Sequence, residues 1–251
     1  IAVNIGLTVA QIIGGILSGS LALIADALHN FSDAIALIIA FLARRIARRP
    51  ADARMSFGYG RVEVIAALIN YTTLIIVALY LAYEGILRIF NPEPINGWMV
   101  VWIAVIALIV DLVTAALTWS MSKQSMNIRA AFLHNIADAL GSVAVIIAGT
   151  FVILKDWVWV DPAVTLLISG YILFHVKAEI GDVIRVLMLG SPPGLDGEVV
   201  AQSVESIDGV EQIHHMHLWA MQEHSAALDA HVVITAGLWG HADAIKADIK
   251  Q

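Results

Sequence analysis

Long apolar segments separated by short polar breaks constrain the fold of this chain more than any other feature. They cover residues 1–17, 20–43, 62–88, 97–120, 130–154 and 159–184. A helix needs about 20 apolar residues to cross the hydrocarbon core of a bilayer. Because these segments are apolar nearly all round, they lack the polar outer face that a helix of a soluble bundle would need. The pattern therefore predicts an α-helical membrane protein with six transmembrane helices.

Composition supports a membrane protein and excludes several other classes. Hydrophobic residues make up 59% of the 251 residues and charged residues only 14%, whereas about a quarter of a soluble domain is charged. No basic patch with interleaved aromatic residues appears, so we expect no nucleic-acid partner. The chain contains no cysteine, which excludes disulfides and thiolate metal sites.

The positive charges of the short loops predict the orientation in the membrane. Arginine gathers in the second loop, at Arg44, Arg45, Arg48, Arg49, Arg54 and Arg61. The fourth loop carries Lys123 and Arg129, while the first and third loops carry no Lys or Arg and the fifth only Lys155. Cytoplasmic loops carry the excess of Lys and Arg. The second and fourth loops, and hence both termini, are predicted to be cytoplasmic.

The character of the chain changes after the stretch GSPPG at residues 190–194. From there the sequence predicts a helix, two strands and a second helix at residues 196–206, 211–221, 226–235 and 240–250. This order is typical of a small α+β domain, here ferredoxin-like. We therefore expect a six-span domain at residues 1–188 and a cytoplasmic domain at residues 189–251.

Two apolar segments carry the same polar motif, HNFSD at residues 29–33 and HNIAD at residues 134–138. Residues four apart lie on one helix face, so His29 and Asp33 point the same way, as do His134 and Asp138. Each ionisable side chain inside a span costs roughly 2.5–3.5 kcal/mol on insertion scales. Four nitrogen and oxygen ligands suit tetrahedral Zn²⁺, and two carboxylates neutralise a divalent ion. A plain polar contact between helices is the other interpretation, and the second copy of the motif favours metal.

Four stretches carry a resemblance to a known family: GSLALIADALHNFSDAIAL, FGYGRVEVIAALIN, HNIADALGSV and HHMHLW. They resemble the zinc-transporter branch of the cation diffusion facilitator family, in its bacterial form. The resemblance implies a homodimeric antiporter of the inner membrane, not an enzyme, that exports Zn²⁺ from the cytoplasm in exchange for protons. It places the transport site between the second and fifth spans, at His29, Asp33, His134 and Asp138.

The resemblance also implies a regulatory zinc site at the dimer interface of the cytoplasmic domain. It assigns His214, His231 and His241 to this site, with His217 as a further candidate. The alternative is a set of solvated strand histidines, because side chains alternate along a strand and His214 would point away from His215 and His217.

Some expected family residues are missing. A second metal site with one Asp and two His follows the second span in some members, but Met55 and Tyr59 stand where those histidines would accompany Asp52. This second site is therefore not expected. Leu189 stands where relatives often carry an acid. If that acid pairs with the base at Arg61, this chain must hold the region differently.

Further acidic side chains lie within the predicted spans. Asp26 is expected to stand beside the four ligands rather than among them, and Asp111 to line a water-filled route.

An intramembrane zinc hydrolase is the leading alternative to a transporter, but a catalytic zinc keeps an open position for water and no HExxH motif appears. A membrane metal sensor is a third possible function. Nor does the sequence separate Zn²⁺ from Cd²⁺, Co²⁺, Fe²⁺ or Mn²⁺.

Overall fold

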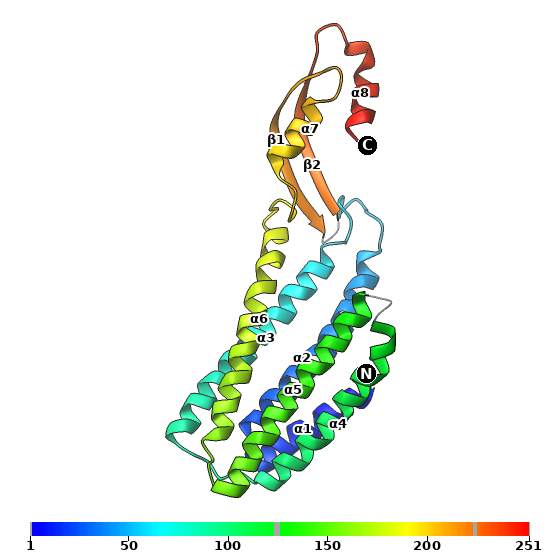
Figure 1. Cartoon of the computed structure of the whole chain (residues 1–251). Helices are drawn as coiled ribbons and strands as arrows, with labels where there is room; N and C mark the ends of the chain where they lie inside the picture. The colour runs from blue at the N-terminus through cyan, green and yellow to red at the C-terminus, as the bar shows by residue number, and fades with distance from the viewer. Residues whose placement is uncertain (1, 123–125, 223–224, 251) are drawn as a thin grey trace. The chain divides into compact units, whose positions relative to one another are not determined.

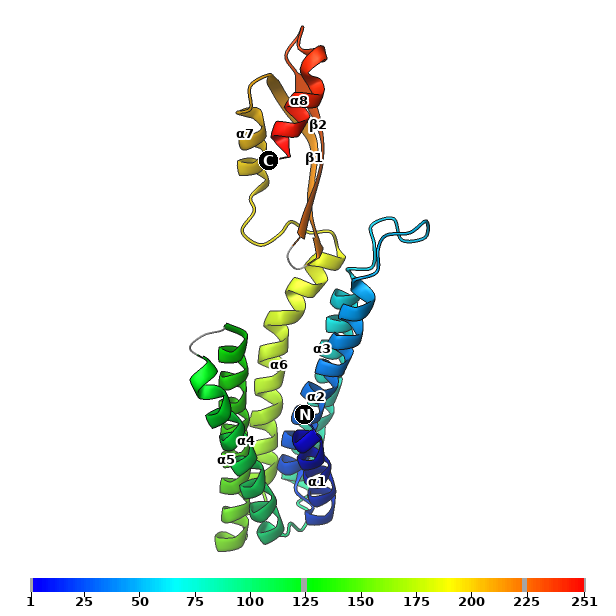
Figure 2. The same ribbon diagram turned by 90° about the vertical axis from the view of Figure 1, so that its right-hand side faces the viewer.

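The computed structural model describes residues 2–122, 126–222 and 225–250, and within them the side chains of residues 2–4, 118, 120–122, 126–131 and 134 lie outside the description. Long helices come first in the chain (Figures 1 and 2). They are α1 (Ala2–Ser18), α2 (Leu21–Ala47), α3 (Val62–Phe90), α4 (Gly97–Ser122), α5 (Met126–Lys155) and α6 (Val160–Leu187). Among the described residues, α2 to α6 are long and apolar enough to cross a membrane, while α1 is apolar but shorter. The predicted fold class is confirmed.

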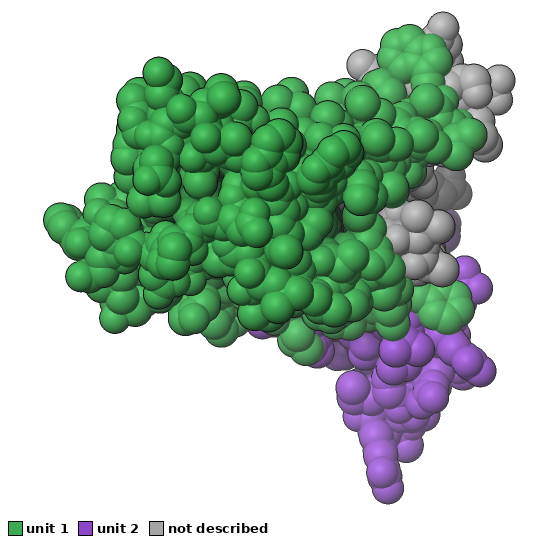
Figure 3. All heavy atoms as spheres, turned by 90° about the horizontal axis from the view of Figure 1, so that it is seen from below, with its two compact units in different colours: residues 1–41, 69–179 green, residues 42–68, 180–251 purple. Residues whose placement is uncertain are grey.

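The chain forms two compact units, coloured separately in Figure 3. The first comprises residues 1–41 and 69–179, and the second comprises residues 42–68 and 180–251. Residues 42–68 come from the helical part of the sequence but belong to the same unit as the C-terminal segment. The domain boundary between residues 188 and 189 stays a prediction.

Helices α4 and α5 lie side by side, and glycine allows their close approach (Figures 1 and 2). A Cβ atom on Gly97 would lie 2.8 Å from the carbonyl oxygen of Gly149, and a Cβ on Gly149 would lie 2.9 Å from a methyl group of Val101. Small residues are favoured where membrane helices touch, because they let the backbones meet. A larger side chain at either glycine would force α4 and α5 apart.

The start of α2 is capped by a side chain from α6. The carboxylate of Asp161 accepts hydrogen bonds from the Ser20 hydroxyl, from the Leu21 amide at 2.7 Å and from the Ala22 amide at 3.2 Å. The first amides of a helix have no partner within the helix and need one from elsewhere. Asp161 is 1% exposed, so these bonds fix the first residues of α2 against α6.

The turn between α1 and α2 is held by two further segments. Gly19 has φ +75°, and a Cβ there would lie 2.7 Å from the carbonyl oxygen of Pro94. Glycine takes this left-handed conformation without the steric cost that other residues meet. The Arg88 guanidinium of α3 donates to the Gly19 carbonyl at 2.7 Å, and the Asn96 amide donates to the Ser18 carbonyl at 2.8 Å.

Burial changes sharply along α2. Leu23 and Ala25 are 0% exposed near its start, whereas Leu37 and Phe41 further along are 62% and 69% exposed. The core around this start is formed by residues of α2, α4, α5 and α6, namely Ala22, Leu23, Val100, Ala104, Val145, Ala148 and Val164. The beginning of α2 is therefore packed inside the bundle, and its later part is not.

The C-terminal segment forms a small α+β structure built on one hairpin. Its elements are α7 (Gly197–Glu205), β1 (Val210–Gln222), β2 (Ser225–Ile234), the 3₁₀ helix η1 (Trp239–His241) and α8 (Ala242–Ile249). Strands β1 and β2 pair antiparallel, with His214 opposite His231. The register shifts between His214 and His217, and His215 has φ +49°. Such a bulge inserts a residue and redirects the side chains near it.

The link between α6 and β1 contains the region where the family resemblance leads one to expect an acid. Leu189 takes φ +60° directly after α6, and the Gly190 amide returns to the Arg185 carbonyl at 2.8 Å, which is a common way to end a helix. The Arg61 guanidinium donates to the Met221 carbonyl at 3.4 Å. With Leu at position 189, Arg61 thus contacts backbone at the end of β1.

Candidate metal centre

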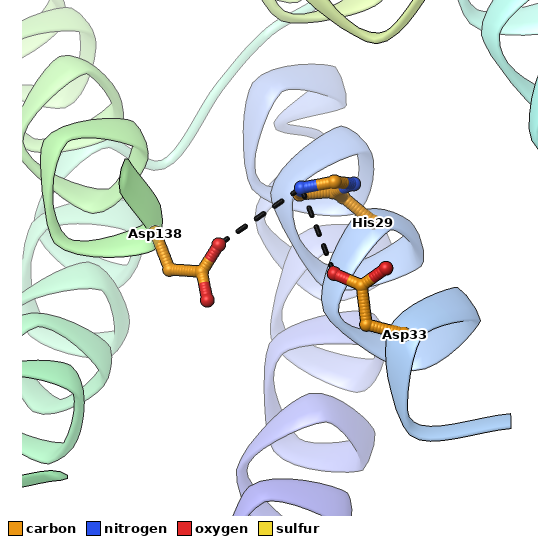
Figure 4. Close-up of side chains that lie close together, drawn as sticks. All are labelled: His29, Asp33 and Asp138. Atoms are coloured by element: carbon orange, nitrogen blue, oxygen red, sulfur yellow. Dashed lines mark ion pairs between the residues drawn. The ribbon is translucent and has the colours of Figure 1, made fainter. Parts of the chain in front are cut away.

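Three of the four side chains predicted to bind metal meet between α2 and α5 (Figure 4). His29 and Asp33 lie one turn apart on α2, and their Nε2 and Oδ2 atoms are 3.7 Å apart. Asp138 of α5 brings Oδ1 to 3.9 Å from the same imidazole nitrogen. One ligand atom from each residue lies within 4.8 Å of the others. The helical spacing on α2 and the approach of Asp138 from α5 together produce this group.

The fourth predicted ligand, His134, lies on α5 four residues before Asp138. Its side chain lies outside the described part of the chain. Residues four apart share a helix face, so the backbone puts position 134 on the same face as Asp138. The role of His134 stays a prediction.

The dimensions of the group fit a small divalent ion. Ligand atoms about 2.0–2.1 Å from a tetrahedral zinc ion are roughly 3.3 Å apart. The observed separations of 3.7 and 3.9 Å are a few tenths of an ångström wider. One imidazole and two carboxylates provide borderline and hard ligands, and the carboxylates balance two positive charges.

The site lies at the boundary between the packed and the exposed parts of α2. The Asp138 side chain is 8% exposed, whereas those of His29 and Asp33 are 23% and 27% exposed. Two of the three side chains thus remain partly accessible, while the third, Asp138 on α5, is buried. An ion bound here would be held between the core and the less tightly packed part of the bundle.

Buried polar side chains surround this site. Asp26 of α2 is 4% exposed and accepts a hydrogen bond from the Gln11 amide of α1 at 2.8 Å. A Cβ on Gly141 of α5 would lie 3.0 Å from Asp26 Oδ1, so glycine there admits the carboxylate. Ser142 donates to Asp111 of α4 at 3.3 Å. The pairing of Gln11 with Asp26 was not predicted, and its signal in the sequence was the amide of Gln11 within a mostly apolar segment.

The hairpin gathers three imidazoles that differ from the predicted set. The ring centroids of His214, His215 and His231 are 5.2, 5.3 and 5.4 Å apart in the three pairs, and we call these three residues the imidazole cluster. The expectation that His214 points away from His215 is wrong, because the bulge and the positive φ of His215 interrupt the alternation. Within the described side chains, ring contacts link neither His217 nor His241 to the cluster.

The loop after α2 uses its acid for local hydrogen bonds. Asp52 accepts from the amides of Arg54 and Met55 at 2.8 and 2.9 Å and from the Tyr59 hydroxyl at 2.7 Å. These bonds lower the pKa of Asp52 below its ordinary value, and the bond from Tyr59 has the largest effect. Tyr59 thus bonds to the carboxylate from a position where some family members carry a histidine.

Comparison with protein families covers almost the whole chain. Residues 1–188 match the family described as the cation efflux transmembrane domain. Residues 192–251 match the family described as the cation efflux protein, cytoplasmic domain. The two matches follow each other in the order expected from the helical and α+β segments.

Individual relatives are similar over most of their length. A cadmium, cobalt and zinc/H⁺-K⁺ antiporter of Bacillus subtilis is 36% identical over 231 residues, which is 91% of this chain and 74% of the relative. The metal cation efflux system protein CzcD of Cupriavidus metallidurans is 37% identical over 225 residues, or 90% and 71%. The zinc transporter ZitB of Escherichia coli is 36% identical over 223 residues, or 88% and 71%.

Proposed function

The chain belongs to the cation efflux family, also called cation diffusion facilitators, in its zinc-transporter branch, and we propose that it exports Zn²⁺ from the cytoplasm in exchange for protons. Relatives named as zinc transporters and as a zinc/H⁺-K⁺ antiporter support the ion and the exchange. The convergence of His29, Asp33 and Asp138 from two helices is the observation that carries the proposal.

The proposed transport site is tetrahedral, with His29 and Asp33 from α2 and His134 and Asp138 from α5. Four ligands from the chain leave no open position for a reacting water, which distinguishes the site from catalytic zinc. Two carboxylates make the loaded site formally neutral. That neutrality lowers the cost of keeping a divalent ion away from water during transport.

Proton exchange follows from the chemistry of the ligands. Zinc binds neutral imidazole and ionised carboxylate, so loading the site releases protons. When zinc leaves, bare carboxylates in a water-poor site are unfavourable and take up protons again. An alternation of helix packing that exposes the site to each side in turn then moves zinc one way and protons the other.

The remaining features of the proposal concern assembly and location. We propose a homodimer in the inner membrane, with both termini in the cytoplasm and a domain boundary between residues 188 and 189. The cytoplasmic domain would bind zinc as a regulatory ion, through ligands drawn from His214, His217, His231 and His241. The similarity of residues 192–251 to the family's cytoplasmic domain supports this part.

Zinc flux into proteoliposomes tests the proposal. We expect zinc uptake driven by an opposing pH gradient, with protons leaving as zinc enters. Asp138→Ala should stop uptake, while Asp182→Ala, which removes an exposed carboxylate of α6, should not. A zinc hydrolase or a metal sensor would move no net zinc, so the absence of flux through the folded protein would overturn the proposal.

A further inference from the structure

We propose that His214, His215 and His231 form a divalent-cation site within the hairpin of a single protomer, with His215 completing it. The proposal rests on the regulatory zinc site proposed above and changes its composition. The family resemblance assigns His241 to this site and places the site at a dimer interface. The structure instead brings His215, to which the resemblance gives no role, against His214 and His231.

The spacing of the rings is the first support. Three imidazoles on one tetrahedral ion, each with a metal–nitrogen bond of about 2.0–2.1 Å, place their ring centres about 5 Å apart. The three centroid distances of the imidazole cluster are 5.2, 5.3 and 5.4 Å. The rings therefore already stand at the separation that a shared ion requires.

The backbone of His215 is the second support. A non-glycine residue with positive φ is uncommon, and such residues gather at functional sites where the surrounding structure holds them. His215 has φ +49° at the register shift between His214 and His217. In a regular strand its side chain would point to the opposite face from His214. The bulge therefore turns His215 toward His214 and His231, so that the three rings meet.

Binding requires the ring nitrogens of the cluster to turn toward one another. Among the described residues, the ligand atoms that already meet within 4.8 Å are those of His29, Asp33 and Asp138, so the cluster nitrogens still have to turn inward. Rotation of a histidine ring about its Cβ–Cγ bond is soft. His215 and His231 are exposed, which leaves the site open to ions in the surrounding water.

The ligand set defines the class of ion. Three imidazoles suit Zn²⁺ and other borderline ions such as Co²⁺, Ni²⁺ and Cu²⁺, and disfavour Mg²⁺, Ca²⁺ and Mn²⁺. The fourth position is left for water or another ligand. Because one hairpin supplies all three imidazoles, binding does not need a ligand from a second copy.

Zinc titration of the full chain by calorimetry tests the proposal, with Asp33→Ala as the background that disables the transport site. The test variant is His215→Asn, because Asn tolerates positive φ but provides no imidazole. We expect zinc affinity at the remaining site to fall at least tenfold. His215→Gly, which relieves the backbone and also removes the ring, should give the same loss. Gln212→Ala changes an exposed residue of the same strand and serves as the matched control.

The family-implied set predicts the opposite pattern. If His241→Ala weakens binding tenfold and neither His215 variant does, the proposal is overturned. A loss that occurs with His215→Asn but not with His215→Gly also overturns it, because a strained backbone and not the imidazole would then be responsible. The transport site is judged separately: zinc bound equally by the original chain and by Asp33→Ala would refute that site alone.

Discussion

The intramembrane group and the imidazole cluster, the two metal sites that we propose, combine their side chains in different ways. In the membrane, one imidazole and two carboxylates meet with their ligand atoms within 4.8 Å, and Asp138 is buried. In the hairpin, the ring centroids of three imidazoles lie 5.2 to 5.4 Å apart, and two of the three residues are exposed. A charged ion in lipid needs neutralising carboxylates, whereas water screens the charge of an ion at an exposed site. The surroundings thus explain why the acids lie in one site only.

The two sites also depend on different parts of the backbone. The intramembrane group follows from residues four apart on α2 and from the approach of Asp138 on α5. The imidazole cluster depends on a register shift and on one residue with φ +49°. We therefore expect substitutions in the helices to act through ligand chemistry, and those in the hairpin to act through backbone geometry as well.

Removal of a carboxylate from the intramembrane group should have the largest effect. Asp33→Ala or Asp138→Ala leaves one ligand fewer and an unbalanced positive charge on the bound ion. Zinc uptake into proteoliposomes should fall to the level of liposomes without protein. Each variant should elute from gel filtration as the original does. Normal uptake by either would show that the carboxylate does not bind the transported ion.

A change of ligand type within the same group should alter selectivity rather than abolish transport. His29→Asp replaces a borderline nitrogen by a hard oxygen and adds a negative charge, which favours Mn²⁺ and other hard ions. The ratio of zinc to manganese transport should fall, by about tenfold if one ligand dominates the choice. Competition uptake with both ions present measures this ratio, and an unchanged ratio would mean that other ligands set the preference.

Loss of imidazoles from the hairpin should affect stability and leave the intramembrane ligands in place. Zinc at a hundred times its dissociation constant stabilises a folded protein by about 2.7 kcal/mol. Zinc should therefore raise the melting temperature of the C-terminal segment in the full chain. The double variant His214→Ala/His231→Ala should lose that increase, as followed by calorimetry. An equal increase in both proteins would identify the cluster as ordinary strand histidines.

The smallest expected effect concerns Asp52 in the loop after α2, which belongs to neither of the two proposed metal sites. Tyr59→Phe removes the largest cause of the lowered pKa of Asp52, so that pKa should rise toward its ordinary value. A lowered pKa in the folded state stabilises the loop above the unfolded pKa, and this stability is lost as pH falls through the folded pKa. The variant should lose loop order at a higher pH than the original. A carboxyl NMR titration of Asp52 checks the shift.

The sequence predicted the helices and the shared face of His29 and Asp33 because both follow from periodicity. Apolar length predicts spans, and a spacing of four predicts a shared face, so His29 and Asp33 could be paired without coordinates. The same reasoning failed for His215, because a bulge is a local exception to the period of a strand. Nor could spacing reveal the bond from Gln11 to Asp26, which joins separate helices. Contacts between elements need the tertiary arrangement.

The cap that Asp161 places on α2 makes one end of that helix a fulcrum. Sliding or turning α2 about its axis would break the bonds to the Leu21 and Ala22 amides, but tilting about them would not. At 1.5 Å per residue, Asp33 stands about 18 Å along the helix from Leu21. A tilt of about 10° at the fulcrum therefore carries Asp33 about 3 Å sideways, which is longer than a metal–oxygen bond of about 2 Å. A small angular change at a well-anchored end is thus enough to open the coordination that we propose further along the same helix.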